Sequence, residues 1–171
     1  WTIGIEMTEN KENTDEYMLT GQCLDNSTDA IKFVKEYSCG AKEYFNAVSS
    51  SSTASYKYDD DGNIVLETGA YDFYFSKSKN ETYIGKLAPS ACYITGIGGN
   101  DKEIKLSLND AKTEFVSTQA AGIQVKSTDK VKVRLEWSCG ASAEYVALDD
   151  ASCATSSNSG ITMKDGYYDF Y

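Results

Sequence analysis

The sequence predicts an all-β protein built from two tandem immunoglobulin-like β-sandwich modules. Three observations lead to this fold class. Apolar and polar side chains alternate with a period of two, polar turns recur about every 8–12 residues, and one set of sequence blocks occurs twice in the same order. No stretch of the chain shows convincing apolar periodicity of the helical kind.

Three stretches carry the alternation most clearly. In "AIKFVKEY", residues 30–37, and "VKVRLEW", residues 131–137, apolar side chains alternate with lysine, arginine or glutamate. In "AYDFYFS", Tyr71, Phe73 and Phe75 fall on one face. Such a pattern is typical of half-buried antiparallel strands.

The chain repeats itself at an offset near 100 residues. The matching blocks are residues 29–45 with 129–146, 5–20 with 104–118, and 63–74 with 160–171. Because three blocks keep their order, two copies of one module are the economical interpretation. The phrases "GAYDFYFS" and "GYYDFY" then occupy the same place in each copy.

The module boundary is predicted in the proline-bearing stretch "KLAPSA", which gives modules 1–87 and 88–171. Upstream of it, "ETYIG" is interpreted as the closing strand of the first copy. Downstream, "ACYITGIGG" is interpreted as the opening strand of the second. We therefore expect the first module to lack its opening strand and the second its closing strand. The alternative, copies that are naturally short, would leave unpaired strand edges, which β proteins usually avoid.

Composition narrows the possible functions. The net charge of −10 argues against a nucleic-acid partner. Histidine is absent, which removes the commonest general base and most zinc sites. No apolar run approaches the roughly 20 residues needed to cross a bilayer, so no membrane insertion is expected. No cofactor and no metal are expected either.

The order of these signals resembles the starch-binding type of carbohydrate-binding module, which occurs in tandem on secreted amylases and starch-adherence proteins of gut bacteria. The likeness lies in the "IEMT" strand, "EYMLTG", the "IKFV" strand, the aromatic loop after it, "DDDGNIVLETGAYDFYF" and "ETYIG". It implies a non-catalytic β-sandwich that holds α-glucan against a shallow aromatic cradle. The implied cradle positions are Tyr37, Tyr44 and Phe45 in the first copy, and Trp137 and Tyr145 in the second.

The sequence departs from the family at one place. The family's "FNNW" phrase is replaced in the second copy by "GIGGNDKE", and Trp1 is the candidate remnant of its tryptophan in the first copy. Sugar binding is therefore expected to be better in the first copy than in the second.

The residues of the aromatic loops suit a sugar on chemical grounds. An aromatic face accommodates the C–H patch of a pyranose ring, and neighbouring polar groups bond its hydroxyls. In "EYSCGAKEYFNA", Lys42 and Asn46 accompany the aromatic residues as candidate ligand-binding groups. The alternative is that Tyr37 and Trp137 end core-facing strands and fill the sandwich.

The five cysteines indicate an oxidising compartment, and an extracellular or cell-surface location is expected. Local pairing predicts the disulfides Cys23–Cys39 and Cys139–Cys153, which leaves Cys92 over. The alternative is that these cysteines are free buried thiols.

The stretch "DDDGN", residues 59–63, resembles part of a calcium loop but lacks the final glutamate of that pattern. A hairpin turn centred on Asp61-Gly62 is the preferred interpretation. Two glycosylation sequons, at Asn26 and Asn80, fit exposed loops.

Two classes of function remain. The first is non-catalytic carbohydrate binding, with α-glucan as the expected polysaccharide partner. The second is a structural or adhesive repeat that contacts neighbouring modules or subunits through unpaired edge strands. Catalysis is not expected. Glycoside hydrolysis needs a pair of carboxylates, but among 26 acidic residues some carboxylates, such as Glu67 and Asp165, fall near turns by chance.

Overall fold

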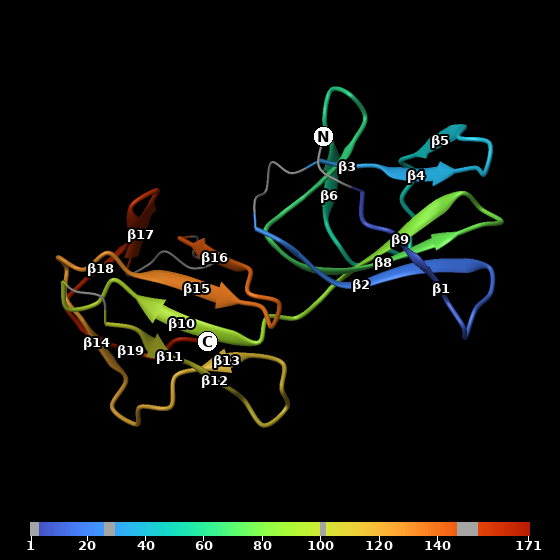
Figure 1. Ribbon diagram of the computed structural model, residues 1–171. Helices are drawn as coiled ribbons and strands as arrows, with labels where there is room; N and C mark the ends of the chain where they lie inside the picture. Colours follow the sequence, from blue (N-terminus) through green and yellow to red (C-terminus); the bar gives the residue numbers. More distant parts are fainter. Residues whose placement is uncertain (1–3, 26–29, 100–101, 147–153) are drawn as a thin grey trace. The chain divides into compact units, whose positions relative to one another are not determined.

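The computed structural model describes residues 4–25, 30–99, 102–146 and 154–171, and these residues form strands and turns without a helix (Figure 1). The predicted all-β class is thus confirmed, and the several sheets are consistent with a β-sandwich. Trp1, Asn26 and Cys153 lie outside the described residues. The strands are β1 (Thr8–Glu9), β2 (Glu16–Leu24), β3 (Ala30–Ile31), β4 (Phe33–Glu36), β5 (Lys42–Phe45), β6 (Tyr56–Tyr58), β7 (Ile64–Leu66), β8 (Gly69–Ser76), β9 (Glu81–Lys86), β10 (Ala91–Thr95), β11 (Ile104–Lys105), β12 (Ser107–Leu108), β13 (Phe115–Val116), β14 (Ile123–Val125), β15 (Lys132–Glu136), β16 (Ser142–Tyr145), β17 (Ala154–Ser157), β18 (Gly160–Met163) and β19 (Gly166–Tyr168).

The chain divides into two compact units. Unit 1 comprises Trp1–Ala88 together with Cys139–Ala141, and unit 2 comprises Pro89–Ser138 and Ser142–Tyr171. The sequence places the module boundary between residues 87 and 88, next to this division. The short segment Cys139–Ala141 belongs to the second copy in sequence and to unit 1 in space.

Unit 1 is organised around β8. This strand lies between β2 and β9 in the four-stranded sheet β1-β2-β8-β9 (Figure 1). As the alternation predicts, Tyr71, Phe73 and Phe75 are buried, whereas Asp72 and Tyr74 between them are only half-buried. The buried rings face the core that Ile64, Ile84 and other apolar side chains complete.

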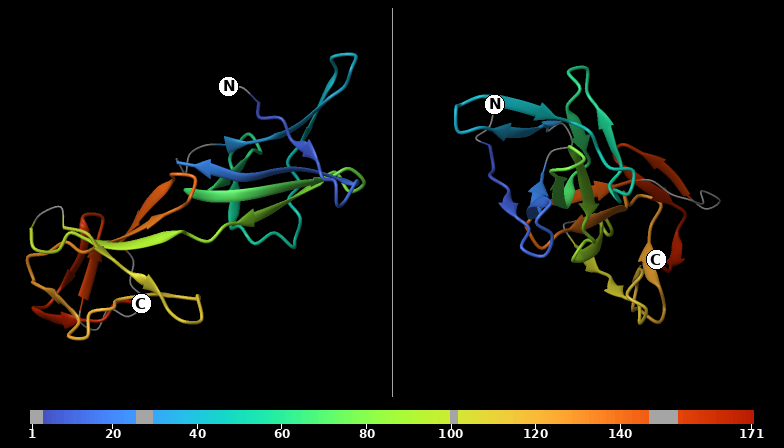
Figure 2. Two further views of the ribbon diagram at one scale, coloured as in Figure 1. Left: turned by 60° about the horizontal axis from the view of Figure 1, so that its bottom comes forward. Right: turned by 90° about the vertical axis from the view of Figure 1, so that its right-hand side faces the viewer.

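Two smaller sheets of unit 1 cover this core. One has the order β3-β7-β6, and the other is the β4-β5 hairpin, which protrudes beyond the four-stranded sheet (Figure 2). The predicted hairpin turn joins β6 to β7, where Tyr58 pairs with Ile64. Gly62 adopts a φ of 73°, a conformation that favours glycine.

The carboxylate of Asp59 holds this turn together. Its Oδ1 accepts hydrogen bonds from the backbone N–H groups of Asp61 and Asn63, at 3.0 and 2.7 Å. Its Oδ2 accepts one from the Asn63 side chain at 2.8 Å. The "DDDGN" stretch therefore uses its first carboxylate within the turn.

Unit 2 contains the four-stranded sheet β11-β10-β15-β16 and three two-stranded pairs, β12-β13, β14-β19 and β17-β18. Its separate core gathers buried side chains of β10, β14 and β18, among them Ile94, Ile123 and Ile161. Gly96 follows β10 with a φ of 76°, and a side chain there would collide with the carbonyl of Lys130.

The strand pairings of unit 1 recur in unit 2. The β4–β5 hairpin pairs Val34 with Tyr44, and the β15–β16 hairpin pairs Arg134 with Glu144. The β1–β2 hairpin has its counterpart in β12–β13. The pairing of β3 with β7 has its counterpart in an antiparallel bridge between Val131, just before β15, and Ile161 of β18. The repeated sequence blocks therefore form equivalent ladders with equivalent registers.

The repeated aromatic phrase places one tyrosine at the same kind of corner in both units. The Tyr71 hydroxyl donates a hydrogen bond to the carbonyl of Glu67 at 2.8 Å. The Tyr168 hydroxyl donates one to the carbonyl of Lys164 at 2.9 Å. Each bond ties a strand tyrosine to the backbone four residues upstream, before the strand begins, in the manner of a tyrosine corner.

The disulfide pairing predicted from the sequence is wrong. Cys23 bonds Cys139 across a sequence separation of 116 residues, with Cα atoms 5.8 Å apart, and both residues belong to unit 1. Cys39 is an exposed free thiol beyond β4, and Cys92 is a buried free thiol. Cys23 lies in β2, in a different sheet from the hairpin that carries Cys39, so sequence proximity does not bring these two together. The bond is weakly consistent with an extracellular location.

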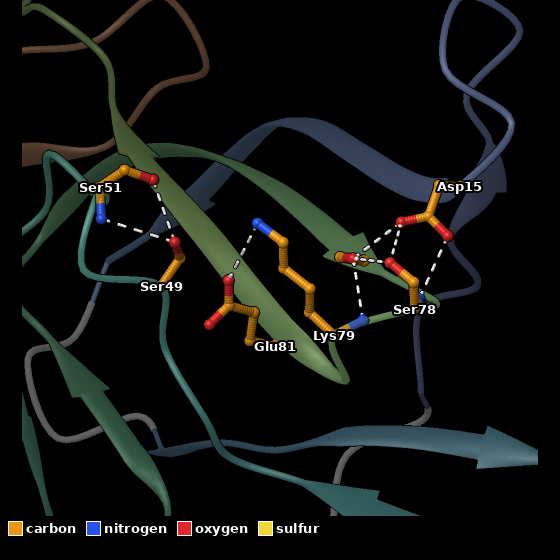
Figure 3. Close-up of polar contacts among 7 residues, drawn as sticks. Asp15, Ser49, Ser51, Ser78, Lys79 and Glu81 are labelled. Carbon is orange, nitrogen blue, oxygen red and sulfur yellow. Dashed lines mark hydrogen bonds and ion pairs between the residues drawn. The ribbon is translucent and has the colours of Figure 1, made fainter.

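Asp15 connects the β1–β2 turn to the β8–β9 turn (Figure 3). Its carboxylate accepts hydrogen bonds from the Ser76 hydroxyl at 2.9 Å and from the Ser78 hydroxyl at 2.7 Å. The Ser78 backbone N–H adds a third at 3.1 Å. The hydroxyl bonds from Ser78 and Ser76 are the main reason why the pKa of Asp15 lies below its ordinary value of 3.8.

Replacing Tyr71 by phenylalanine should destabilise unit 1 by about 1 kcal/mol, because the hydrogen bond from this buried tyrosine to the Glu67 carbonyl is lost. Urea unfolding measures the change in the free energy of unfolding. Tyr168→Phe should cost unit 2 less, because that residue is only half-buried. Tyr167→Phe, at a position 65% exposed, is the control and should be neutral. Equal effects of all three substitutions would contradict the corner assignment.

Peptide mapping without reduction should recover Cys23 joined to Cys139. In the folded protein a maleimide should modify Cys39 and spare Cys92, because Cys92 is 3% exposed and burial raises the pKa of its thiol. After unfolding, both thiols should react. Recovery of a Cys23–Cys39 peptide would restore the pairing that the sequence suggests.

Asp15→Asn should lower the melting temperature at neutral pH and leave it nearly unchanged near pH 2. The ionised carboxylate is favoured in the folded state, so its stabilisation is full above the ordinary pKa and is lost as the pH falls through the lower folded pKa. Melting temperatures of both proteins between about pH 7 and pH 2 measure this convergence. Ser78→Ala, which removes one of the hydroxyl bonds, should give a smaller change of the same sign. A constant difference across the range would contradict this linkage.

Candidate functional site

The predicted aromatic residues of unit 1 lie on the β4–β5 hairpin, but they do not share one face. Strand alternation places Phe33 and Phe45 on one face and Val34 and Tyr44 on the other. Phe45 packs against Phe75, with ring centroids 5.1 Å apart. Phe45 therefore belongs to the core side of the hairpin and cannot stack on a sugar beside Tyr44.

Tyr37 is 40% exposed and lies at the end of β4 on the side of Glu43 and Lys35. Its hydroxyl donates a hydrogen bond to the Glu43 carboxylate at 2.8 Å. The Lys35 ammonium lies 4.8 Å from the ring centroid. Lysines lie over both rings, but Lys35 is closer to Tyr37 than Lys32 is to Tyr44, and Tyr37 is less exposed, so Tyr37 is the weaker candidate.

Tyr44 is the most accessible of the predicted aromatic residues, at 60% exposure. The ammonium of Lys32 lies 5.6 Å from its ring centroid. On the same face Lys42 forms an ion pair with Glu36 at 3.4 Å. This face therefore offers an exposed ring with charged groups beside it.

Asn46 leads from Tyr44 to a tyrosine pair that the sequence analysis missed. The side-chain amide of Asn46 donates a hydrogen bond to the backbone carbonyl of Gly62 at 2.7 Å. The backbone carbonyl of Asn46 accepts one from the Tyr58 hydroxyl at 2.9 Å. Tyr56 and Tyr58 project from the same side of β6, with their rings edge to face and centroids 5.5 Å apart. They are 41% and 48% exposed.

The positive charge of Lys32 acts on both Tyr44 and Asp59. Hydrogen bonds from Asn63 are the main reason why the pKa of Asp59 lies below its ordinary value, and the positive charge of Lys32 contributes in smaller part. Lys32 therefore lies near both Tyr44 and the residue that follows Tyr58. We call the set Tyr44, Asn46, Tyr56 and Tyr58 the tyrosine surface.

One hydroxyl of the tyrosine surface, that of Tyr58, is partly desolvated. Burial, followed by the neighbouring Tyr56, raises the pKa of the Tyr58 hydroxyl. A shallow hollow of about 240 Å³ lies beside Tyr56 and is also lined by Lys57, Val65 and Glu67. The signal for this site was readable in "SYKYDDDGN", where period-two spacing puts two tyrosines on one face next to a turn.

The predicted residues of unit 2 make a different arrangement. Trp137 is buried at 3% exposure, which favours the core alternative for this residue. Tyr145 is half-buried and pairs with Val133, as Phe45 pairs with Phe33 in unit 1. Trp137 and Tyr145 therefore form no exposed aromatic platform.

One hollow of unit 2 is polar. It measures about 450 Å³ and is lined by glycines, threonines and charged residues, without an aromatic ring. Lys132 and Glu144 form an ion pair at 2.7 Å in its wall. The guanidinium of Arg134 lies over the ring of Tyr93, a residue of β10, at 4.7 Å from the ring centroid. This hollow thus offers hydrogen-bonding groups without a ring for stacking, and the exposed rings of unit 2, Tyr167 at 65% and Tyr171 at 90%, are not part of its lining.

No protein-family model, curated protein or solved structure matches the chain. Within the part of the chain that the structure describes, no group of three or more cysteine, aspartate or glutamate side chains could hold a metal ion. The same residues form no helix long and apolar enough to cross a membrane. A function must accordingly be argued from the surface chemistry of the two units.

Proposed function

We propose that the chain is a non-catalytic carbohydrate-binding segment of a secreted or cell-surface protein, and that unit 1 holds α-glucan on the tyrosine surface. The observation that carries the proposal is the exposure of Tyr44, Tyr56 and Tyr58, together with the hydrogen bond from the Tyr58 hydroxyl to the backbone carbonyl of Asn46, two residues beyond Tyr44. Aromatic rings stack on the C–H face of a pyranose, while an amide and lysines bond its hydroxyls. The starch-binding resemblance favours α-glucan among polysaccharides.

In this proposal the two units are immunoglobulin-like modules in tandem. Support comes from the equivalent tyrosine corners at Tyr71 and Tyr168, a feature of immunoglobulin-like sandwiches. The recurring strand registers support a common module as well. The disulfide between Cys23 and Cys139 fits secretion.

Unit 1 is the stronger sugar site of the two. It keeps exposed rings beside Asn46 and Lys32, whereas unit 2 buries Trp137 and covers the ring of Tyr93 with Arg134. Shallow surfaces that stack one or two sugar rings bind with free energies of roughly −4 to −6 kcal/mol, which correspond to high micromolar to millimolar dissociation constants.

A structural or adhesive repeat is the second candidate function. The burial of Trp137 and the core position of Phe45 favour it, because a binding module keeps its rings exposed. Lysines placed over the rings of Tyr37 and Tyr17 favour it in the same way. The choice between the two functions rests on whether the tyrosine surface binds a sugar.

Calorimetry with maltoheptaose and with an unrelated β-glucan tests the proposal. Maltoheptaose should bind, and Tyr44→Ala and Tyr58→Ala should each remove about 1–2 kcal/mol of the binding free energy through loss of ring contact. Both positions are exposed, so the fold should survive, which a circular dichroism melt checks. Tyr17→Ala is the matched control, because that ring is 39% exposed in the same unit and lies outside the tyrosine surface.

The binding results for the two sugars distinguish the two candidate functions. If neither sugar binds at millimolar concentration, or if the tyrosine-surface variants bind as the wild type does, the structural repeat is the better conclusion. If the β-glucan binds as well as maltoheptaose, the α-glucan assignment fails while carbohydrate binding stands.

A further inference from the structure

Strand β10 of unit 2 lies between two neighbours. On one side Ile94 pairs with Ile104 of β11, and on the other it pairs with Val133 of β15. Cys92 and Ile94 are buried in the core of the unit, at 3% and 1% exposure. The strand therefore completes both the sheet and the core of unit 2.

Unit 1 contains the counterparts of both neighbours. The sequence block 5–20 matches 104–118, which makes Ile5 the counterpart of Ile104. Ile5 is 66% exposed, whereas Ile104 is half-buried beneath its pairing with β10. Strand β4, the counterpart of β15, has three exposed residues of four, whereas all of β15 is half-buried.

The hydrogen-bonding groups of β4 point in the direction that this comparison requires. The Tyr37 N–H donates a hydrogen bond to the Ala41 carbonyl. Because hydrogen-bonded pairs alternate along an antiparallel ladder, Lys35 and Phe33 also direct their backbone groups to β5. By that alternation the backbone N–H and C=O groups of Val34 and Glu36 face away from β5. Among the residues that the structure describes, only β5 pairs with β4.

The equivalent groups of unit 2 are occupied. Arg134 and Glu136, the counterparts of Val34 and Glu36, pair with Tyr93 and Ala91 of β10. The Leu106 N–H bonds the Cys92 carbonyl, so the alternate residue, Tyr93, directs its backbone groups to β15. Unit 2 thus shows what covers this edge when the sheet is complete.

We infer that the outer edge of β4 is a strand-acceptor site, which binds an extended peptide segment of the β10 type in antiparallel orientation. The occupant presents apolar side chains at alternate positions, as Cys92 and Ile94 do, and covers the exposed side of Ile5. Backbone hydrogen bonds to Val34 and Glu36 supply the affinity, and the apolar positions supply the register. The site adjoins the tyrosine surface, because Val34 pairs with Tyr44, but it uses the backbone groups of β4 and does not depend on the proposed function.

The probe is a synthetic peptide of residues 90–99 with Cys92→Ala, so that no thiol can react with Cys39. It is added in excess to the full chain, and amide hydrogen exchange is followed residue by residue. The amides of Val34 and Glu36 should exchange at least about tenfold more slowly than without the peptide. The exchange of the amides of the β12–β13 pair in unit 2 should not change. The melting temperature of unit 1 should rise with peptide concentration.

Two controls test the edge itself. Val34→Pro removes an outward N–H without removing a β4–β5 hydrogen bond, because the Val34 N–H points away from β5. Proline is tolerated at such positions of an edge strand. The variant should lose the response to the peptide. Methylation of the peptide nitrogen at the position of Tyr93 should abolish the response of the wild type, and this control does not depend on how well Val34→Pro folds.

The outcomes decide the inference in either direction. Slower exchange at Val34 and Glu36 that both controls remove supports the strand-acceptor site. The site is refuted if the peptide at about 1 mM leaves these amides unchanged. It is equally refuted if the methylated peptide protects them as well as the unmodified one does.

Discussion

The alternation of side chains along β8 is the constraint on which unit 1 depends. Its inward rings are Tyr71, Phe73 and Phe75, and they line one side of the core. From the β4–β5 hairpin, Phe33 packs on Phe73 and Phe45 packs on Phe75. Because a strand has only two faces, the packing of Phe45 on the core side turns the preceding residue, Tyr44, outward. The exposed ring that the proposed function requires is therefore a consequence of how the core is filled.

The two units share their ladders and differ in what covers them. In unit 2, β10 covers the edge of β15, and Arg134 lies over the ring of Tyr93. In unit 1 the corresponding edge of β4 is exposed, and tyrosines of β5 and β6 face solvent. Equivalent backbones thus carry different surfaces, which is how repeated modules acquire different roles without a change of register.

Short polar contacts, rather than the core, position the turns beside these surfaces. Asp59 accepts hydrogen bonds inside the β6–β7 turn and so fixes the end of β6 that carries Tyr58. Asp15 does the same for the β8–β9 turn through Ser76 and Ser78. Ionised carboxylates that accept several hydrogen bonds rigidify such turns above their pKa.

The sequence by itself determined the all-β class, the burial of alternate rings on β8 and the turn at Asp61-Gly62, because each follows from the period of a strand or the backbone freedom of one glycine. It also provided the repeat whose blocks form equivalent ladders. Only the tertiary structure decided that Cys23 meets Cys139, that Trp137 is buried, and that Phe45 and Tyr44 part to opposite faces. It also brought Tyr58 to Asn46. The physical reason is that periodicity fixes which side chains share a face, whereas disulfides, burial and surface clusters depend on which faces meet, and that is set by contacts between residues far apart in the chain.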